Sequence, residues 1–211
     1  MSKIEEIAQA VEMGKAKVVP GLVEEALAEG LDPMEILNKG MIDSMGVVGE
    51  KFKNNEIFVP EMLVAARAMK KGVEVLKPHL GADNSATIGK MVMGTVAGDL
   101  HDIGKNLVIM MIESAGFEVI DLGVDVPIER FIEAASDPDV NIVGCSALLT
   151  TTMPAMEETV KALNEAPFRD RIKIMVGGAP ITQEFADKIG ADCYTEDAAA
   201  AAEAAKKLMG K

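Results

Sequence analysis

The segment 98–106, Gly-Asp-Leu-His-Asp-Ile-Gly-Lys-Asn, holds the residues of this chain that are best suited to chemistry. Asp99 precedes His101 by two residues, and a carboxylate at that spacing can accept a hydrogen bond from one ring nitrogen of the histidine. Such a bond fixes the tautomer of the imidazole and leaves the other nitrogen free to bind a metal. His101 is also one of only two histidines among 211 residues. The segment therefore predicts a ligand or metal site at His101.

The elements on either side place this segment at the edge of a sheet. Residues 90–96 are apolar and partly β-branched, and a small Ala-Gly pair ends the run, which predicts a short buried strand. Apolar residues recur at helical spacing from Ile103 onward, so a helix begins there. The segment then lies between the carboxyl end of a strand and the amino end of a helix, where open α/β sheets bind their ligands.

From residue 88 onward, apolar runs and helical patterns alternate. The predicted strands are 89–96, 117–121, 141–145, 172–176 and 191–194. The predicted helices are 103–115, 128–135, 153–165, 181–188 and 197–209. The alternation predicts an α/β fold, a doubly wound parallel sheet of five strands in flavodoxin-like, Rossmann-like order with right-handed crossovers. The loops expected to converge at its carboxyl edge are 97–104, 145–153, 177–180 and 195–198.

Two other converging loops also carry unusual residues. Ser146 and the run Thr150-Thr151-Thr152 supply four hydroxyls in seven residues, and Gly177-Gly178 leaves the backbone open to close approach. Each feature has an ordinary structural interpretation by itself: a satisfied polar histidine, a helix cap or a tight turn. Their joint placement on one edge of the sheet favours a binding site.

The first third of the chain contains no convincing strand and predicts a compact bundle of four amphipathic helices. The apolar stripes cover residues 4–11, 18–27, 36–52 and 60–80. Gly30 is expected to end the second helix in the left-handed conformation, and Asp32-Pro33 to open the third as N-cap and first helical residue. The small polar segment 81–85 reads as a linker. We therefore predict a helical domain over 1–84 and an α/β domain over 85–211.

Composition excludes several classes of function. The formal net charge is −13 and no Lys/Arg run occurs, which argues against nucleic-acid binding. No apolar run approaches the roughly 18 residues of a membrane span. Cys145 and Cys193 lie far apart and form neither a zinc pair nor a redox pair. The expectation is a cytoplasmic protein whose partners are neither nucleic acid nor membrane.

The spacing of three motifs resembles that of the corrinoid (cobalamin)-binding domain. The pattern is Asp-x-His-x-x-Gly, then 41 residues, then Ser-x-Leu, then 28 residues, then Gly-Gly. Its members here are Asp99, His101, Gly104, Ser146, Leu148, Gly177 and Gly178. Residues 48–52 and 58–69 resemble the helical cap of cobalamin-dependent methyltransferases. In size and domain order the chain is similar to the small corrinoid proteins of methanol, methylamine, glycine betaine and methoxyaromatic methyltransferase systems, and its motifs resemble the cobalamin-binding module of methionine synthase.

The resemblance implies a base-off, His-on cofactor, with His101 as the lower axial ligand to cobalt. Asp99 would hold the imidazole, and Thr152 would take the place of the serine that usually completes this relay. The other cofactor contacts that it implies are Gly98, Leu100, Asp102, Ile103, Gly104, Ser146, Leu148, Thr150, Gly177, Gly178 and Ala198. In the helical domain, Phe52, Val59 and Met62 match cap positions over the reactive face, and ordinary bundle core is an equally good interpretation of all three.

The function that this resemblance implies is methyl transfer by a non-catalytic corrinoid subunit in one-carbon metabolism. The cofactor, cobalamin or its methyl form, would be loaded by a substrate-specific methyltransferase, unloaded by a corrinoid:acceptor methyltransferase and maintained by a reductive activase. His101 would leave cobalt and rebind during the cycle, and the segment 81–88 would act as a hinge. The alternative is a cobalamin-binding sensor or storage module without methyl transfer.

Three other classes fit the sequence less well. A His-Asp metal-dependent phosphohydrolase needs further histidines, only His79 remains, and the strand–helix alternation contradicts its all-helical fold. A dinucleotide-binding oxidoreductase would show Gly-x-Gly-x-x-Gly after the first strand, and that motif does not follow it here. A cobalamin-dependent isomerase subunit normally lacks the helical cap.

Overall fold

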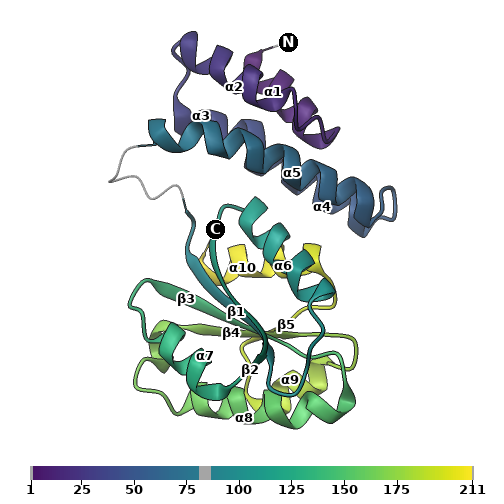
Figure 1. Cartoon of the computed structure of the whole chain (residues 1–211), viewed down its shortest axis with the longest axis vertical. Coiled ribbons are helices and arrows are strands. Elements are labelled where there is room, and N and C mark those ends of the chain that lie inside the picture. Colours follow the sequence, from purple (N-terminus) through teal and green to yellow (C-terminus); the bar gives the residue numbers. More distant parts are fainter. Residues whose placement is uncertain (1, 81–86, 211) are drawn as a thin grey trace. The chain divides into compact units, whose positions relative to one another are not determined.

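The computed structural model describes residues 2–80 and 87–210, which separate into two compact units (Figure 1). Among the described residues, the helical unit contains 2–80 and 114–116, and the α/β unit contains 87–113 and 117–210. The predicted linker at 81–85 and the predicted domain boundary between residues 84 and 85 lie outside the described residues.

The helical unit contains the four predicted helices. Its elements are α1 (Lys3–Glu12), α2 (Val19–Ala28), α3 (Pro33–Leu37), the π-helical segment η1 (Asn38–Ile42), α4 (Asp43–Lys53), α5 (Val59–Leu76) and the short 3₁₀ segment η2 (Lys77–His79). The predicted third helix runs through α3, η1 and α4 without a break. Gly30 ends α2 with φ of +84°, and Asp32 accepts a hydrogen bond from the Glu35 amide at 3.0 Å. Both predicted helix ends are therefore confirmed.

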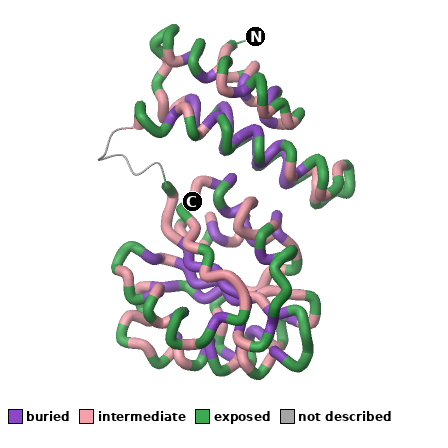
Figure 2. Tube along the Cα trace, in the orientation of Figure 1, coloured by how far each residue is buried: buried purple, intermediate pink, exposed green. Residues whose placement is uncertain are grey.

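The core of the helical unit is aliphatic and rich in methionine, and Figure 2 shows it as buried stripes along the helices. Ile7, Val19, Ile36 and Met41 are fully buried. Ser44 is the polar exception: its hydroxyl donates to carbonyl oxygens of the preceding turn at 2.7 and 3.2 Å. A serine can satisfy itself this way in any helix, so it needs no partner from another element.

The α/β unit has the predicted fold. Its strands are β1 (Lys90–Val96), β2 (Glu118–Val126), β3 (Val140–Ser146), β4 (Lys173–Gly177) and β5 (Cys193–Tyr194). All pair in parallel in the order β2-β1-β3-β4-β5, which is the flavodoxin-like order. The helices are α6 (Ile103–Ser114), α7 (Ile128–Ala135), α8 (Met153–Asn164), α9 (Gln183–Ile189) and α10 (Ala198–Leu208). In Figure 1, α6 and α10 cover one face of the sheet, and α7, α8 and α9 cover the other.

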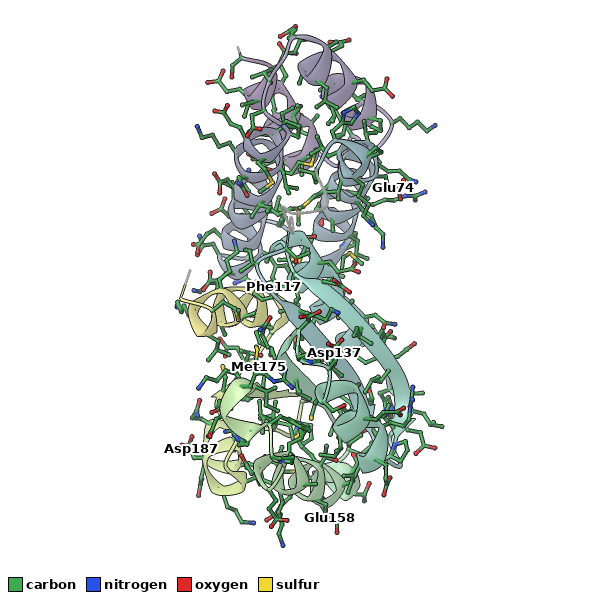
Figure 3. All side chains as sticks on the ribbon, turned by 90° about the vertical axis from the view of Figure 1, so that its left-hand side faces the viewer. Glu74, Phe117, Asp137, Glu158, Met175 and Asp187 are labelled. Atoms are coloured by element: carbon green, nitrogen blue, oxygen red, sulfur yellow. The ribbon has the colours of Figure 1, made fainter. Side chains whose placement is uncertain are left out.

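The three central strands β1, β3 and β4 are buried on both faces, which explains their nearly continuous apolar runs. A hydrophobic core fills the layer between the sheet and α7, α8 and α9, with Phe131 at its centre. Gly94 of β1 makes room for it, because a methyl group there would lie 2.8 Å from the Phe131 ring. At the amino edge of the sheet, Asp137 (labelled in Figure 3) pairs with Lys90 of β1 at 3.2 Å.

The strand β2 differs from its prediction. The sequence predicts a strand that ends at residue 121, whereas β2 continues to Val126 through two irregularities in its pairing with β1. Gly123 has φ of +87° and Asp125 has φ of +52°. A strand at the edge of a sheet that contains two left-handed residues has the composition of a turn, so its pattern does not predict its length.

Candidate functional site

The loop after β1 carries the predicted chemistry and is fixed at several points. Gly98, with φ of +80°, turns the chain away from the strand. The Thr95 hydroxyl, on the strand itself, donates to the His101 carbonyl oxygen at 2.9 Å. The side chain of Asp99 is completely buried, whereas that of His101 is 51% exposed. The loop thus buries the carboxylate and presents the imidazole at its surface.

Asp99 joins the loops that follow β1 and β3. Its Oδ1 accepts from the Nδ1 of His101 at 2.8 Å and from the amide of the same residue at 3.1 Å. Its Oδ2 accepts from the Leu148 amide at 2.7 Å and from the Thr152 hydroxyl at 2.8 Å. The structure therefore brings together three residues that the sequence assigns to one relay: His101, Asp99 and Thr152.

These donors decide the charge of Asp99. Burial by itself raises the pKa of the carboxyl, but the hydrogen bonds from Leu148, from the amide and ring of His101 and from Thr152 lower it more, so the pKa lies well below its usual range. A charged carboxylate can only accept, so Nδ1 of the imidazole carries the proton of their shared bond. The other ring nitrogen, Nε2, then holds a lone pair that can bind a metal.

Thr152 fits the relay despite its extra methyl group. The hydroxyl lies 2.8 Å from Asp99 Oδ2 and 2.9 Å from the Leu149 carbonyl oxygen. The methyl group lies on the side of Gly98, where an added Cβ would be at ordinary van der Waals distance, 3.7 Å. The methyl group therefore lies beside Gly98 without a clash while the hydroxyl reaches the carboxylate.

The loops after β3 and β4 are pressed against each other at Gly178. Its φ is +133°, and an added Cβ would lie 1.8 Å from the Ala147 carbonyl oxygen. The Ala147 amide in turn donates to the Gly177 carbonyl oxygen at 3.2 Å. The need for glycine at 178 therefore comes from the neighbouring loop, and its contact with a ligand stays a prediction.

Large apolar side chains lie exposed beside His101. Leu100 is 71% exposed and Ile103 is 79% exposed, and Leu148 and Leu149 are each more than 40% exposed. Exposing a cluster of apolar side chains to water is unfavourable, so such a cluster indicates a binding surface. Leu149 is absent from the predicted contacts, although its place beside Leu148 in the sequence is a signal for it.

Lys105 is a second residue that the sequence does not single out. Its side chain is only 1% exposed, and its amine donates to Asp121 of β2 and to the Asn106 side chain, each at 2.7 Å. Lysine is rarely buried to this degree, and burial is not visible in a sequence. The ion pair fixes the first turn of α6, one turn after His101.

The remaining predicted residues fall into two groups. Those of the α/β unit lie at or just after the carboxyl ends of the strands or in the first turn of a helix: Asp102, Gly104, Ser146, Thr150, Gly177 and Ala198. Phe52, Val59 and Met62 belong to the helical unit, where Met62 is buried and the other two are half-buried. Their role as a cap stays a prediction.

Within 2–80 and 87–210, no group of three or more His, Cys, Asp and Glu side chains could hold a metal ion. Over the same ranges, no helix has the length and hydropathy needed to cross a membrane.

Comparison with known proteins agrees with this geometry. Two family profiles, each described as a B12 binding domain, match residues 89–205 and 3–77. Dimethylamine corrinoid protein 1 of Methanosarcina acetivorans is 46% identical over 207 residues, which is 98% of this chain and 97% of that protein. Trimethylamine corrinoid protein 1 of the same organism is 49% identical over 179 residues, 84% of this chain and 83% of that protein.

A solved structure has the same fold. A chain of the methanol:cobalamin methyltransferase complex MtaBC from Methanosarcina barkeri superposes with a TM-score of 0.87 and 32% identity, covering 99% of this chain and 80% of that one. The buried carboxylate that holds the histidine therefore belongs to a chain whose α/β unit matches a B12 binding domain. The chain belongs to the corrinoid proteins of methyltransferase systems, and its cofactor is a corrinoid.

Proposed function

We propose that this chain is a methyl carrier that binds cobalamin base-off, with His101 in place of the cofactor's own base. The observation that carries the proposal is the 2.8 Å bond between His101 Nδ1 and the buried Asp99 carboxylate. When bound, the cobalt of the corrinoid accepts a methyl group from one partner and gives it up to another. The protein's contribution is to hold the cofactor and adjust its axial ligand.

The residues present fit this cofactor. His101 offers Nε2 as a metal ligand on a half-exposed ring, and the buried Asp99 carboxylate orients that ring through Nδ1. When His101 does not ligate, its hydrogen bond to Asp99 keeps the ring in place. The Thr152 hydroxyl supports the carboxylate in both states, so the relay needs no rearrangement of the β3 loop.

The same proposal assigns roles to the other predicted residues. The exposed side chains that follow β1 and β3 would form an apolar surface against which the corrin ring packs: Leu100, Ile103, Leu148 and Leu149. The displaced nucleotide tail would contact the small and hydroxyl residues of the carboxyl edge: Ser146, Thr150, Gly177, Gly178 and Ala198. In the helical domain, proposed as residues 1–84, the side chains of Phe52, Val59 and Met62 would cover the opposite face of the cofactor.

The relatives suggest the partners. Two of them are named for dimethylamine and trimethylamine, and the matching structure comes from a methanol:cobalamin methyltransferase complex. We therefore propose a methylamine:corrinoid methyltransferase as the partner that loads this chain, a second methyltransferase that unloads it, and a reductive activase that restores an inactive cofactor.

The first experiment is the visible spectrum of the full chain reconstituted with hydroxocobalamin. The wild type should bind one equivalent and show a histidine-ligated, base-off spectrum. His101→Ala should alter that spectrum. His79→Ala is the matched control, since the other histidine lies exposed in η2 of the helical unit. An unchanged spectrum in His101→Ala would overturn the His-on assignment, and failure to bind any corrinoid would overturn the proposal as a whole.

A second experiment separates carriage from storage or sensing. The reconstituted, reduced chain is incubated with a methylamine methyltransferase and each methylated amine in turn. A carrier should show the methylated-cofactor spectrum with one of these amines and lose it when the second methyltransferase and acceptor are added. A chain that binds cobalamin tightly and is never methylated would be a storage or sensor module.

A further inference from the structure

The C-terminal half of β2 forms hydrogen bonds with the loop that carries Asp99 and His101. The Oδ1 of Asp125 accepts a hydrogen bond from the Gly98 amide at 2.7 Å. The backbone amide of Asp125 donates to the Asp99 carbonyl oxygen at 2.9 Å. Asp125 of the edge strand thus binds the backbone of two consecutive loop residues, Gly98 and Asp99.

The backbone of Asp125 shows that this contact has a conformational cost. Asn55 and Asp125 are the two non-glycine residues with positive φ in the ranges 2–80 and 87–210, at +58° and +52°. Side chains disfavour this left-handed region, although aspartate and asparagine tolerate it best. In that conformation both the amide and the carboxylate of Asp125 bind the neighbouring loop.

A second aspartate of β2 holds the other end of the loop. Asp121 accepts from the buried Lys105 amine at 2.7 Å, and Lys105 lies four residues after His101 in α6. The same carboxylate oxygen accepts from the Gly123 amide at 2.9 Å, which fixes Asp121 within the irregular part of the strand. The segment from Gly98 to Lys105 is therefore anchored at both ends to β2.

We infer that Asp125 is a positioning residue for His101. It fixes the Gly98-Asp99 backbone so that the buried carboxylate can hold the imidazole and Thr152 at once, and Asp121 with Lys105 provides the second anchor. This inference rests on the proposed function, because it concerns the ligand nitrogen that His101 offers to the cofactor. Asp125 itself touches neither the ring nor Thr152 in the hydrogen bonds of the structure.

The test compares three variants of the full chain. Asp125→Gly relaxes the left-handed backbone but removes the carboxylate. Asp125→Asn keeps an oxygen acceptor and tolerates the same φ, so it is the conservative rescue. Asn55→Gly relaxes a residue of nearly identical φ in the helical unit and controls for the backbone effect of glycine. Each variant is examined without cofactor by amide hydrogen exchange and, after reconstitution with hydroxocobalamin, by its visible spectrum.

In the cofactor-free protein, the Gly98 amide should exchange roughly tenfold faster in Asp125→Gly than in the wild type, because it loses its side-chain oxygen acceptor. The reconstituted variant should show a mixture of histidine-ligated and unligated spectra. Asp125→Asn and Asn55→Gly should keep the wild-type exchange rate and spectrum. A wild-type, fully histidine-ligated spectrum in Asp125→Gly would overturn the inference.

Two further observations keep the test decisive. If Asp125→Gly does not fold, the exchange rate of the Gly98 amide in the wild type tests the inference instead. That amide must exchange at least roughly tenfold slower than the amide of an unstructured glycine, and unprotected exchange overturns the inference. If the wild type itself shows no histidine ligation, the proposed function fails, whereas histidine ligation that Asp125→Gly leaves intact sinks only the role of Asp125.

Discussion

Ser44 and Asp99 are both buried polar side chains, but the two units satisfy them in different ways. Ser44, in the helical unit, donates to carbonyl oxygens of its own helix, three and four residues earlier. Asp99, in the α/β unit, accepts from His101 nearby and also from Leu148 and Thr152, which follow it by 49 and 53 residues. The bonds of the serine form whenever its helix forms. Those of the aspartate require the whole sheet.

The difference separates a structural polar group from a functional one. A buried hydroxyl that donates to its own helix has its hydrogen bonds satisfied locally and presents no polar group to solvent. The buried carboxylate gathers donors from two loops and uses one of its oxygens to orient a half-exposed imidazole. Variants that act on one unit and spare the other can therefore test whether the chemistry depends on the long-range network of the sheet edge.

The largest effect is expected from a methyl group at Gly178. In Gly178→Ala the new Cβ would lie 1.8 Å from a backbone oxygen at a φ of +133°, so the two loops must part, at a cost of about 4 kcal/mol or more. In Gly72→Ala of α5 the nearest atom is the flexible Met41 methyl at 2.5 Å. Overpacking of about 1–3 kcal/mol is there offset by about 1 kcal/mol of helix propensity.

Chemical denaturation of both variants measures this difference. Gly123→Ala is the control, because the position has a positive φ but open space around it, so that it reports backbone strain alone. If Gly178→Ala were no less stable than Gly123→Ala, the close contact with Ala147 would not exist in solution.

The next effect concerns the two buried polar groups themselves. In Asp99→Asn one of the two acceptor oxygens becomes an N–H₂ group, so the donors on one side of it, either His101 or Leu148 and Thr152, lose their acceptor, which should destabilise the protein by about 2–4 kcal/mol. Ser44→Ala should cost about 1 kcal/mol, because it removes only a local bond. Free energies of unfolding measure both, and the reconstituted Asp99→Asn should also lose histidine ligation. Equal destabilisation by the two variants would contradict the contrast between the units.

The charge of Asp99 predicts a pH dependence. Because the pKa of Asp99 in the folded protein lies below the usual value of an aspartate, this carboxylate contributes stability that is present above about pH 4 and is lost as the pH falls toward its folded pKa. The difference in unfolding free energy between the wild type and Asp99→Asn should stay constant from pH 7 to about 5 and shrink below about 4. A difference that grows on acidification would mean that Asp99 is protonated in the folded protein.

The smallest effect is expected at Thr152, where two variants divide the side chain. Thr152→Val keeps both branches but removes the hydroxyl from the Asp99 carboxylate, which should cost about 1.5–3 kcal/mol. Thr152→Ser keeps the hydroxyl and loses only the methyl beside Gly98, which should cost about 0.8 kcal/mol. Unfolding free energies and the spectra of the reconstituted proteins measure the two contributions. A serine variant less stable than the valine variant would show that packing, and not the hydroxyl, holds Thr152.

Local patterns predict most of the fold. Buried parallel strands are apolar runs, and the helix starts and stops carry their signals in residues such as Asp32 and Gly30, so the fold class is confirmed. The contact between Asp99 and His101 is also local, because two residues of separation bring them within reach. The role of Thr152 came from the resemblance of the motifs, since nothing in a single sequence connects positions 99 and 152.

The remaining features depend on contacts that no local pattern encodes. The extension of β2 to Val126 depends on its pairing with β1, and its glycine and aspartate residues look like a turn in the sequence. Lys105 looks like a solvent-exposed helix residue, although its amine is buried against Asp121. Gly178 is required by a carbonyl oxygen from another loop. Each is a long-range contact made after the sheet assembles.

The most direct test of the central claim is the electron paramagnetic resonance spectrum of the cobalamin-loaded chain in its cobalt(II) state. The protein is prepared once with ordinary histidine and once with nitrogen-15 histidine. An axial nitrogen-14 nucleus splits the cobalt lines into triplets, and nitrogen-15 splits them into doublets. Ligation by His101 predicts triplets in the ordinary protein and doublets in the labelled one. Triplets that persist in the labelled protein would identify the cofactor's own base as the ligand and contradict the account.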